Sequence, residues 1–357
     1  MVVKITDEEI KQNEFLKNRY QILEHSGEGT FSTVYKAIDL KNSNIEANEV
    51  VYVALKNITK TSSPHRVSEE IKFLLSLNGN DNVVPLLSCL RHQDQITVVF
   101  PYFEFTDFRE FLEKCTVLDI KYYMYNLLLS VKHVHSKNII HRDIKPSNFL
   151  YNFDTKTGQL IDFGLAQYEN PKYSKENALK EMTNTPKKKP TILFFGSMVS
   201  KYVKPPGYYV SDSRPQMKAQ RAGTRGFRAP EVLFRSPCQS RSIDIWSVGV
   251  IFLILLTKQY PFFNSSDDID AILEIACIFG HNEMRKAAKH YERIWKSNIN
   301  TCPTERITFE EIVAGLNPSC NLSAEGYDLL YRMLDLYSER RISAEDALNH
   351  PFFNDIS

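Results

Sequence analysis

His141-Arg-Asp-Ile-Lys-Pro-Ser-Asn148, followed by Asp162-Phe-Gly164, is the part of this 357-residue chain that decides its fold. Asp143 can accept a hydrogen bond from a substrate hydroxyl and, late in the reaction, its proton. Lys145 follows two residues later and can neutralise charge on a migrating phosphoryl group. Few reactions other than ATP-dependent phosphoryl transfer need this set, so the two motifs predict a phosphotransferase whose acceptor is serine or threonine.

Two further predictions concern the metal and the phosphates of the nucleotide. Asn148 and Asp162 offer the hard oxygen ligands that magnesium prefers, so we expect them to hold Mg²⁺. Lys56 ends a β-rich stretch, and a lysine on the inner side of a strand needs a charged partner. Glu70 on the following helix can supply one, and the helical phase favours it over Glu69. We therefore predict that Lys56 and Glu70 act together in catalysis and hold the α- and β-phosphates.

A glycine-containing turn precedes this lysine and predicts a nucleotide site. Gly27 and Gly29 lie between two β-rich segments, where backbone N–H groups can approach phosphates closely. A lone Gly-x-Gly is more often a plain hairpin turn, and the flanking strands favour the phosphate interpretation. Phe100 is the expected gatekeeper before the hinge. The predicted nucleotide-binding residues are Gly27, Glu28, Gly29, Thr30, Phe31, Ser32, Val34, Ala54, Lys56, Tyr102, Phe103 and Leu150.

The segment Arg221-Ala-Gly-Thr-Arg-Gly-Phe-Arg-Ala-Pro-Glu231 predicts the protein-substrate side. Thr224 can hydrogen-bond toward the catalytic loop, although it could instead be a phosphorylation site. Arg221, Arg225 and Arg228 crowd the place where the residue after the acceptor would lie. Because guanidinium groups bind carboxylate or phosphate with paired hydrogen bonds, we predict an acidic or phosphorylated residue there. The alternative is that these arginines hold acidic side chains of the protein itself. We also expect Glu231 to pair with Arg341.

Composition excludes several classes of protein. The chain is 43% hydrophobic and 24% charged, as in globular proteins with a substantial core, and its formal net charge is +1. Bulk charge therefore gives no reason to expect direct nucleic-acid binding. The most apolar run, Val248–Leu256, is shorter than the roughly 20 residues of a membrane span, so we expect no membrane partner. The six cysteines form no Cys-x-x-Cys pair and suit reduced thiols.

The pattern along the chain predicts two lobes. Residues 20–100 read mostly as strands with one helix near Arg66–Leu77, and residues 105–353 read as helices joined to the first lobe by a hinge at 101–104. Helices are expected from Ile120 to about Lys137, Ser242 to Thr257, Ala324 to Leu336 and Ala344 to Asn349. The second of these is apolar on every side and should be buried all round. Residues 1–19 form an extension, and irregular insertions are expected at about 168–220 and 281–322.

These motifs resemble those of eukaryotic protein kinases over about residues 20 to 352. His135-Ser-Lys-Asn-Ile-Ile-His141, the segment from Arg221 to Glu231, and Ile243-Asp-Ile-Trp-Ser-Val-Gly249 more narrowly resemble the cell-division-cycle-seven kinases, the catalytic subunits of the DDK complex. The resemblance implies an α+β, bilobal protein kinase fold with a small β-rich N-lobe and a larger helical C-lobe, and ATP and Mg²⁺ as cofactors. It implies a nuclear enzyme that promotes DNA replication by phosphorylating the replicative helicase. It also implies acid-directed specificity and an activating regulatory subunit of the dumbbell-former type.

Two other interpretations of the sequence stay open. One is a casein-kinase-like or cyclin-dependent-like kinase with an unusual insertion. The other is a pseudokinase scaffold that binds partners without catalysis, against which the intact set of catalytic residues argues.

Overall fold

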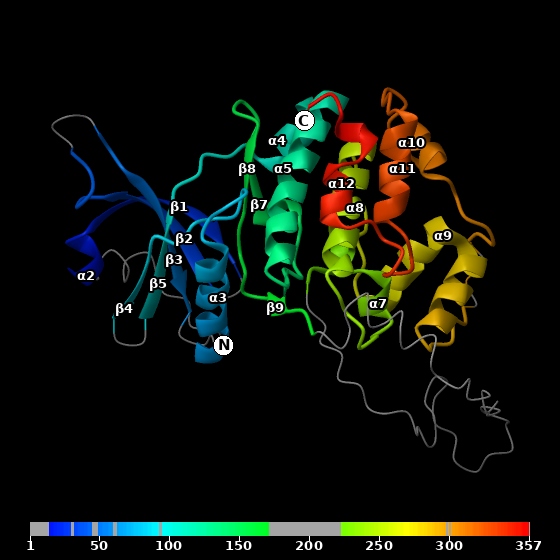
Figure 1. Ribbon diagram of the computed structural model, residues 1–357, viewed down its shortest axis with the longest axis horizontal. Helices are drawn as coiled ribbons and strands as arrows, with labels where there is room; N and C mark the ends of the chain where they lie inside the picture. The colour runs from blue at the N-terminus through cyan, green and yellow to red at the C-terminus, as the bar shows by residue number, and fades with distance from the viewer. Residues whose placement is uncertain are drawn as a thin grey trace, which may run out of the picture.

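The computed structural model describes residues 14–29, 32–44, 49–59, 63–92, 95–170, 223–297, 299 and 301–356. Three predicted site residues, Thr30, Phe31 and Arg221, lie outside these ranges, as does nearly all of the insertion expected at 168–220. The described chain forms a strand-rich lobe and a helical lobe side by side, as expected (Figure 1).

The small lobe is built on a five-stranded antiparallel sheet in the order β1-β2-β3-β5-β4. Its strands are β1 (Tyr20–Glu28), β2 (Ser32–Asp39), β3 (Tyr52–Ile58), β4 (Ser88–His92) and β5 (Gln95–Pro101). β-branched and aromatic residues are frequent in β2, β3 and β5, as the sequence predicted. Leu16 of the short helix α2 (Glu14–Lys17) is buried with Tyr20, Tyr35 and Val53 in one core cluster.

Helix α3 (Pro64–Leu77) is the longer of the two helices described in the small lobe. Proline stands in its first turn, where its absent N–H is not needed, and the left-handed Asn78 ends it. Residues at three- and four-residue steps are buried, and Glu70 is one of them. The helix therefore turns a carboxylate, together with its apolar face, toward the interior of the molecule.

The helical lobe is organised around α5 (Val117–Ser136) and α8 (Ser242–Thr257), which pack against each other. A reciprocal capping box between Thr116 and Asp119 begins α5. Every residue of α8 from Ile243 to Thr257 is buried, so the predicted central helix is confirmed. The other elements are α4 (Phe108–Lys114), β6 (Ile139–Ile140), β7 (Phe149–Asn152), β8 (Thr157–Leu160), β9 (Gln167–Tyr168), α7 (Pro230–Leu233), α9 (Asp268–His290), α10 (Phe309–Leu316), α11 (Ala324–Met333) and α12 (Ala344–Leu348).

The prediction that residues 281–322 are irregular is wrong for two stretches of that range. Helix α9 extends to His290, and α10 occupies Phe309–Leu316. Gly280 has φ 75° and ψ 159°, and this non-helical backbone kinks α9. The position requires glycine, because an added Cβ there would lie 2.6 Å from backbone atoms of Glu305. Beyond the kink Met284, Ala287 and Ala288 are buried at helical spacing. The kink hid this periodicity in the sequence.

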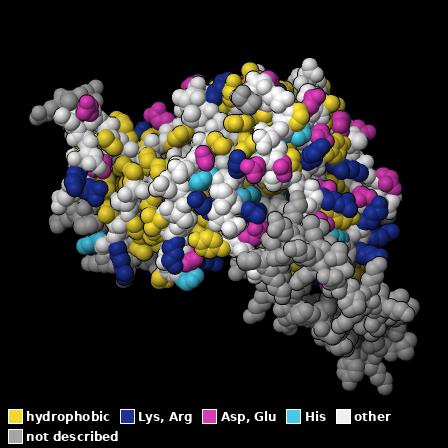
Figure 2. Space-filling view, in the orientation of Figure 1, with side chains coloured by type: hydrophobic (Ala, Val, Ile, Leu, Met, Phe, Trp, Pro, Cys, Tyr) yellow, Lys and Arg dark blue, Asp and Glu magenta, His cyan; other side chains and the backbone are white. Residues whose placement is uncertain are grey.

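The surface carries both signs of charge. Figure 2 shows Lys and Arg side chains interspersed with Asp and Glu over the helical lobe, and hydrophobic side chains gathered over the strands of the small lobe. Within the described part of the chain, no helix has both the length and the apolar character that a membrane crossing requires.

Candidate active site

Lys56 lies at the centre of a chain of charged groups between the lobes. It pairs with Val34 in the register of β2 and β3, so the two side chains share one face of the sheet. Its Nζ lies 2.8 Å from Oε1 of Glu70 and 3.0 Å from Oδ1 of Asp162. Glu69 pairs with Lys72 instead, so the structure brings together the pair that the helical phase favoured.

The charges in this chain stabilise one another. Burial lowers the pKa of Lys56, but the carboxylates of Asp162 and Glu70 outweigh burial and leave that pKa above its ordinary value. The Lys56 ammonium in turn lowers the pKa of Asp162 to about 2. Asp162 is therefore an ionised carboxylate throughout the neutral pH range, which is the form that binds a cation.

A short hairpin brings Asn148 and Asp162 together. Strands β7 and β8 pair with Phe149 opposite Leu160. Asn148 directly precedes the paired stretch, and its carbonyl oxygen accepts a hydrogen bond from the N–H of Ile161 at 2.9 Å. The two predicted metal ligands therefore lie at the same end of the hairpin. The side-chain Nδ2 of Asn148 donates to the backbone oxygen of Asp143 at 2.8 Å, which leaves its Oδ1 as the possible metal-binding atom.

Asp143, Lys145 and Thr224 form the acceptor side of the site. Oδ1 of Asp143 accepts hydrogen bonds from both the backbone N–H and the hydroxyl of Thr224, each at 2.8 Å. Nζ of Lys145 lies 2.8 Å from Oδ2 of Asp143 and 3.0 Å from the Thr224 hydroxyl. The predicted contacts of Thr224 with the catalytic loop are present, and they orient one carboxylate and one ammonium toward a shared position.

Asp244 holds the catalytic loop in place, and the sequence analysis did not identify it. Its carboxylate accepts the backbone N–H groups of His141 and Arg142, each at 2.8 Å, and lies 2.9 Å from Nε2 of His135. Hydrogen bonds from His135 and Arg142 outweigh the effect of burial and keep the pKa of Asp244 below its ordinary value. The sequence signal for this role is a single carboxylate near the start of α8, a helix whose other residues are mostly apolar. A buried carboxylate in such a helix needs hydrogen-bond donors.

The glycine turn fits the predicted phosphate site. A Cβ added at Gly27 would meet no protein atom within 4 Å, so nothing in the described fold itself demands glycine there. At Gly29 the backbone N–H donates to the carbonyl of Ser32 at 2.8 Å and closes the turn. Glu28 is the last residue of β1. The open space beside Gly27 is what a phosphate close to the backbone would need.

The hinge differs in detail from its prediction. Pro101 is still part of β5, and the backbone N–H of Tyr102 donates to the carbonyl of Tyr52 at 3.1 Å. That N–H is therefore already used within the protein, and Phe103 is the better candidate for reading the edge of a base. Ala54 pairs with Phe100 across β3 and β5. Ala54, Val34 and Leu150 are each partly exposed, as residues lining a cleft should be.

On the protein-substrate side, Arg228 is already engaged within the protein in this structure. Its Nη1 lies 2.7 Å from Oδ1 of Asp268, and its Nε donates to the carbonyl of Gly223. The alternative, that an arginine holds the protein's own acid, therefore holds for Arg228. Arg225 is exposed and forms no ion pair with any other described residue. Arg221 lies outside the described residues.

The expected pair between Glu231 and Arg341 is confirmed. Two hydrogen bonds of 2.6 and 2.7 Å join the carboxylate to the guanidinium, and both side chains are fully buried. This bidentate pair fixes α7, and with it the segment that follows Thr224, to the body of the helical lobe.

Comparison with known proteins gives the same assignment as the geometry. The protein kinase domain family matches residues 20–187 and 207–353. The chain belongs to the protein kinase family. It is 57% identical to the probable cell division control protein 7 homolog 1 of Encephalitozoon cuniculi, over 99% of this chain and 97% of that protein. The cell cycle serine/threonine-protein kinase hsk1 of Schizosaccharomyces pombe is 39% identical over 94% of this kinase and 73% of its own length.

The likeness extends to animals. The human cell division cycle 7-related protein kinase is 28% identical over 96% of this chain and 91% of its own length. Within the protein kinases the chain thus belongs to the cell division control protein 7 group of serine/threonine kinases, and its fold is the bilobal α+β fold expected from the sequence.

Membership of this family implies ATP, and the residues present fit it. In the described chain no cluster of three His, Cys, Asp or Glu side chains could hold a metal ion by itself. Mg²⁺ usually takes only one or two protein oxygens and completes its shell with water and phosphate. Asp162 and Asn148 are such a pair. Within the described residues, no atom lies within 4 Å of a Cβ added at Gly27.

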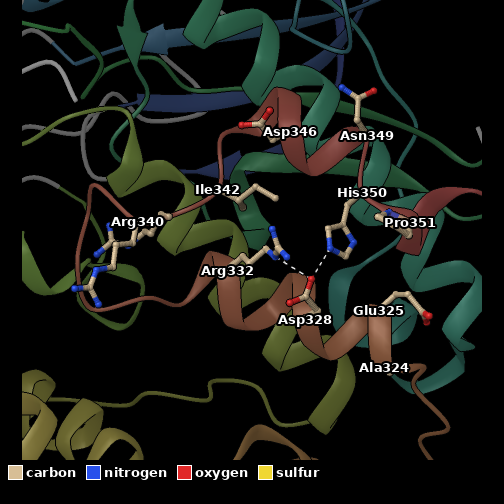
Figure 3. Close-up of a pocket in the computed structure, with 11 residues that line it drawn as sticks. Ala324, Glu325, Asp328, Arg332, Arg340, Ile342, Asp346, Asn349, His350 and Pro351 are labelled. Carbon is tan, nitrogen blue, oxygen red and sulfur yellow. Dashed lines mark hydrogen bonds and ion pairs between the residues drawn. The ribbon is translucent and has the colours of Figure 1, made fainter. Parts of the chain in front are cut away.

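A separate pocket in the helical lobe is lined by residues between Ala324 and Pro351 (Figure 3). It has a volume of about 760 Å³ and lies between α11 and α12. Arg332 and His350 both point at Asp328, with contacts of 2.8 and 2.9 Å. None of the predicted catalytic residues lines this pocket.

Proposed function

We propose that this kinase transfers the γ-phosphoryl group of ATP to serine or threonine followed by an acidic or phosphorylated residue. The observation that carries the proposal is the contact of Asp143 with both Thr224 and Lys145, next to the chain formed by Lys56, Glu70 and Asp162. An acceptor hydroxyl and a nucleotide phosphate each find groups of suitable charge there.

Each residue has a distinct part in this reaction. Asp143 accepts the hydrogen bond of the acceptor hydroxyl and orients its oxygen, and takes the proton late, because the transition state for phosphoryl transfer is loose. Lys145 neutralises charge on the transferred group, and Lys56 binds phosphate while Glu70 keeps it in place. Mg²⁺, when bound, would neutralise charge on the phosphates. Asn148 and Asp162 would hold it.

An acid-directed site is supported by the arginines after Thr224. Arg225 is exposed next to the residue that contacts Asp143. Guanidinium groups bind carboxylate and phosphate through paired, charge-assisted hydrogen bonds. A substrate chain whose acceptor reaches Asp143 would place its next residue near this side chain.

The cellular role is proposed from the relatives. Their names refer to cell division and the cell cycle. We propose that this kinase acts in the nucleus and promotes the initiation of DNA replication by phosphorylating the replicative helicase, as the resemblance of its motifs implies.

An activating regulatory subunit of the dumbbell-former type is proposed on the same basis. Hydrophobic side chains on the small lobe support a docked partner, since Leu75 of α3 is 63% exposed and Leu87 is 52% exposed. Helix α3 carries Glu70, so a protein bound there would act on the position of that carboxylate.

A kinase assay with a peptide series tests the proposed reaction. The kinase, alone and with its co-purified partner, is given Mg²⁺, labelled ATP and peptides that differ only after a central serine: alanine, glutamate or phosphoserine. We expect transfer to serine and a higher kcat/KM for the two acidic peptides. Nucleotide binding without any transfer, with the partner present, would favour a scaffold instead. Equal rates for all three peptides would remove the acid preference.

The identity of the partner and substrate needs a separate test. Pull-down of the native protein from its own cells, followed by mass spectrometry, should return one stoichiometric subunit. In that complex, subunits of the replicative helicase should be phosphorylated at acidic serine sites. Recovery of the kinase as a lone chain would contradict the proposed partner.

A further inference from the structure

The ion pair of Arg228 joins two parts of the helical lobe at the acceptor site. Nη1 of Arg228 lies 2.7 Å from Oδ1 of Asp268, and both side chains are 17% exposed. The Nε of the same guanidinium donates to the carbonyl of Gly223 at 2.8 Å. Asp268 is the first residue of α9, and Asp267 caps that helix through the N–H groups of Ile269 and Asp270. The Asp268 carboxylate thus neutralises the guanidinium of Arg228, in the segment that follows Thr224.

A second guanidinium belongs to the same side of the site. Residues Arg225–Phe227 form a 3₁₀ turn, and the N–H of Arg228 donates to the carbonyl of Arg225 at 3.1 Å. In such a turn the side chains at positions i and i+3 lie on one side. Arg225 is exposed and makes no ion pair with the other described residues. The site therefore offers one guanidinium already neutralised by Asp268 and one that is not.

We propose that Asp268 is a specificity-determining residue, because it competes with the substrate for Arg228. The inference rests on the proposed acid-directed function of the same site. A substrate carboxylate carries the same charge as Asp268 and gains little by displacing it, so it binds to Arg225. A phosphate carries a charge of roughly −1.5 to −2 and three acceptor oxygens, so it can take Arg228 from Asp268 and bind both guanidinium groups. Asp268 thereby favours a phosphorylated residue after the acceptor over a glutamate.

The test compares kcat/KM for the alanine, glutamate and phosphoserine peptides, with the kinase in its native complex. In the wild type, phosphoserine should exceed glutamate, and glutamate should exceed alanine. Asp268→Asn should raise the glutamate-to-alanine ratio about tenfold, the size expected for one added charged hydrogen bond. It should also reduce the phosphoserine-to-glutamate ratio. Asp268→Ser serves as the second variant if the asparagine form does not fold.

Two matched variants identify the cause of any change. Asp270→Asn removes the same charge from the same turn of α9, where Asp270 contacts Ser266 and not Arg228, so the peptide ratios should match those of the wild type. The double variant Arg228→Gln with Asp268→Asn should lose the gain, because the released guanidinium is no longer there.

The outcomes separate the inference from the function on which it rests. Equal rates for all three peptides in the wild type would contradict the acid-directed function itself. If the wild type prefers acidic peptides but Asp268→Asn leaves the glutamate-to-alanine ratio unchanged, the role of Asp268 is overturned and the function stands. An equal rise in Asp270→Asn would also overturn it, since a general change of charge would then be the cause.

Discussion

Arg341 and Glu231 neutralise each other in a fully buried position, joined by two short hydrogen bonds. Replacing Arg341 by methionine would leave the Glu231 carboxylate buried without a counter-charge. We expect the free energy of unfolding to fall by about 3–5 kcal/mol, measured by urea denaturation. Lys114→Met is the control, because its pair with Glu110 is exposed and its loss should cost only about 0.3–0.5 kcal/mol. Equal effects of the two changes would contradict this account of the buried pair.

A substitution at Gly27 should affect nucleotide binding without weakening the fold. An added Cβ would touch no atom of the described residues, so Gly27→Ala should fold normally and gain up to about 1 kcal/mol from the stiffer unfolded chain. The same methyl group would fill space that a bound phosphate needs, so KM for ATP should rise. Thermal unfolding and steady-state kinetics measure the two effects. An unchanged KM would place the phosphates elsewhere.

Single residues also mark the limit of sequence analysis. The pair of Lys56 with Glu70 could be predicted from motif and helical phase, because each residue lies at a fixed place in a local pattern. Asp162 was predicted as a metal ligand, and its contact with Lys56 was not predicted. The partner of Arg228 could not be predicted, because Asp268 is 40 residues away and the start of α9 has no motif. The role of Asp244 could not be predicted either, because the apolar pattern of α8 indicates burial and says nothing of the backbone groups that one carboxylate in it would bind.

Among the elements, α8 shows how tightly the helical lobe is packed. A Cβ added at Gly249 would lie 2.9 Å from side-chain atoms of Leu334 and Met333. Gly249→Ala should therefore destabilise the fold by about 1–3 kcal/mol through overpacking. Gly315→Ala in α10 is the control, because its Cβ would meet nothing and helix propensity should make it neutral or stabilising by up to about 1 kcal/mol. If both variants unfold at the wild-type denaturant concentration, the close contact at Gly249 is absent.

Elements were predictable where one physical signal dominates. The run of apolar residues set the bounds of α8, and three- and four-residue spacing located α3 and α5. Strand β4 (Ser88–His92) is short and mostly polar, so its place is decided by pairing with β5 and not by a pattern of its own. The part of helix α9 after residue 280 was not predicted, because the kink at Gly280 shifts the phase of the buried face.

At the scale of the whole molecule, Lys56 and Asp162 connect the two lobes directly. A nucleotide bound between them should stabilise both lobes together. We expect Mg²⁺ and ATP at about 100 times Kd to add about 2.7 kcal/mol to the free energy of unfolding. Chelation of Mg²⁺ should remove most of the resulting rise in Tm, and Asp162→Asn should do the same in the presence of metal. A rise in Tm that does not depend on Mg²⁺ would contradict the assignment of Asn148 and Asp162.

The two-lobed architecture could be predicted as a whole, because the sequence pattern changes along the chain. A strand-rich part precedes the catalytic motifs, and a helical part follows them. The contact between the substrate site and helix α9 could not be predicted, because it depends on how segments distant in the sequence pack together. That packing is what converts one of three predicted substrate arginines into an internal ion pair.

The central claim is that Asp143 orients the acceptor hydroxyl in a working phosphotransferase, and Asp143→Asn tests it most directly. The wild type and this variant are compared, each with the co-purified partner, for phosphate transfer to the glutamate peptide and for the Mg²⁺–ATP shift in Tm. We predict that transfer falls by at least about 100-fold while the thermal shift persists. Near-normal transfer by the variant would contradict the claim.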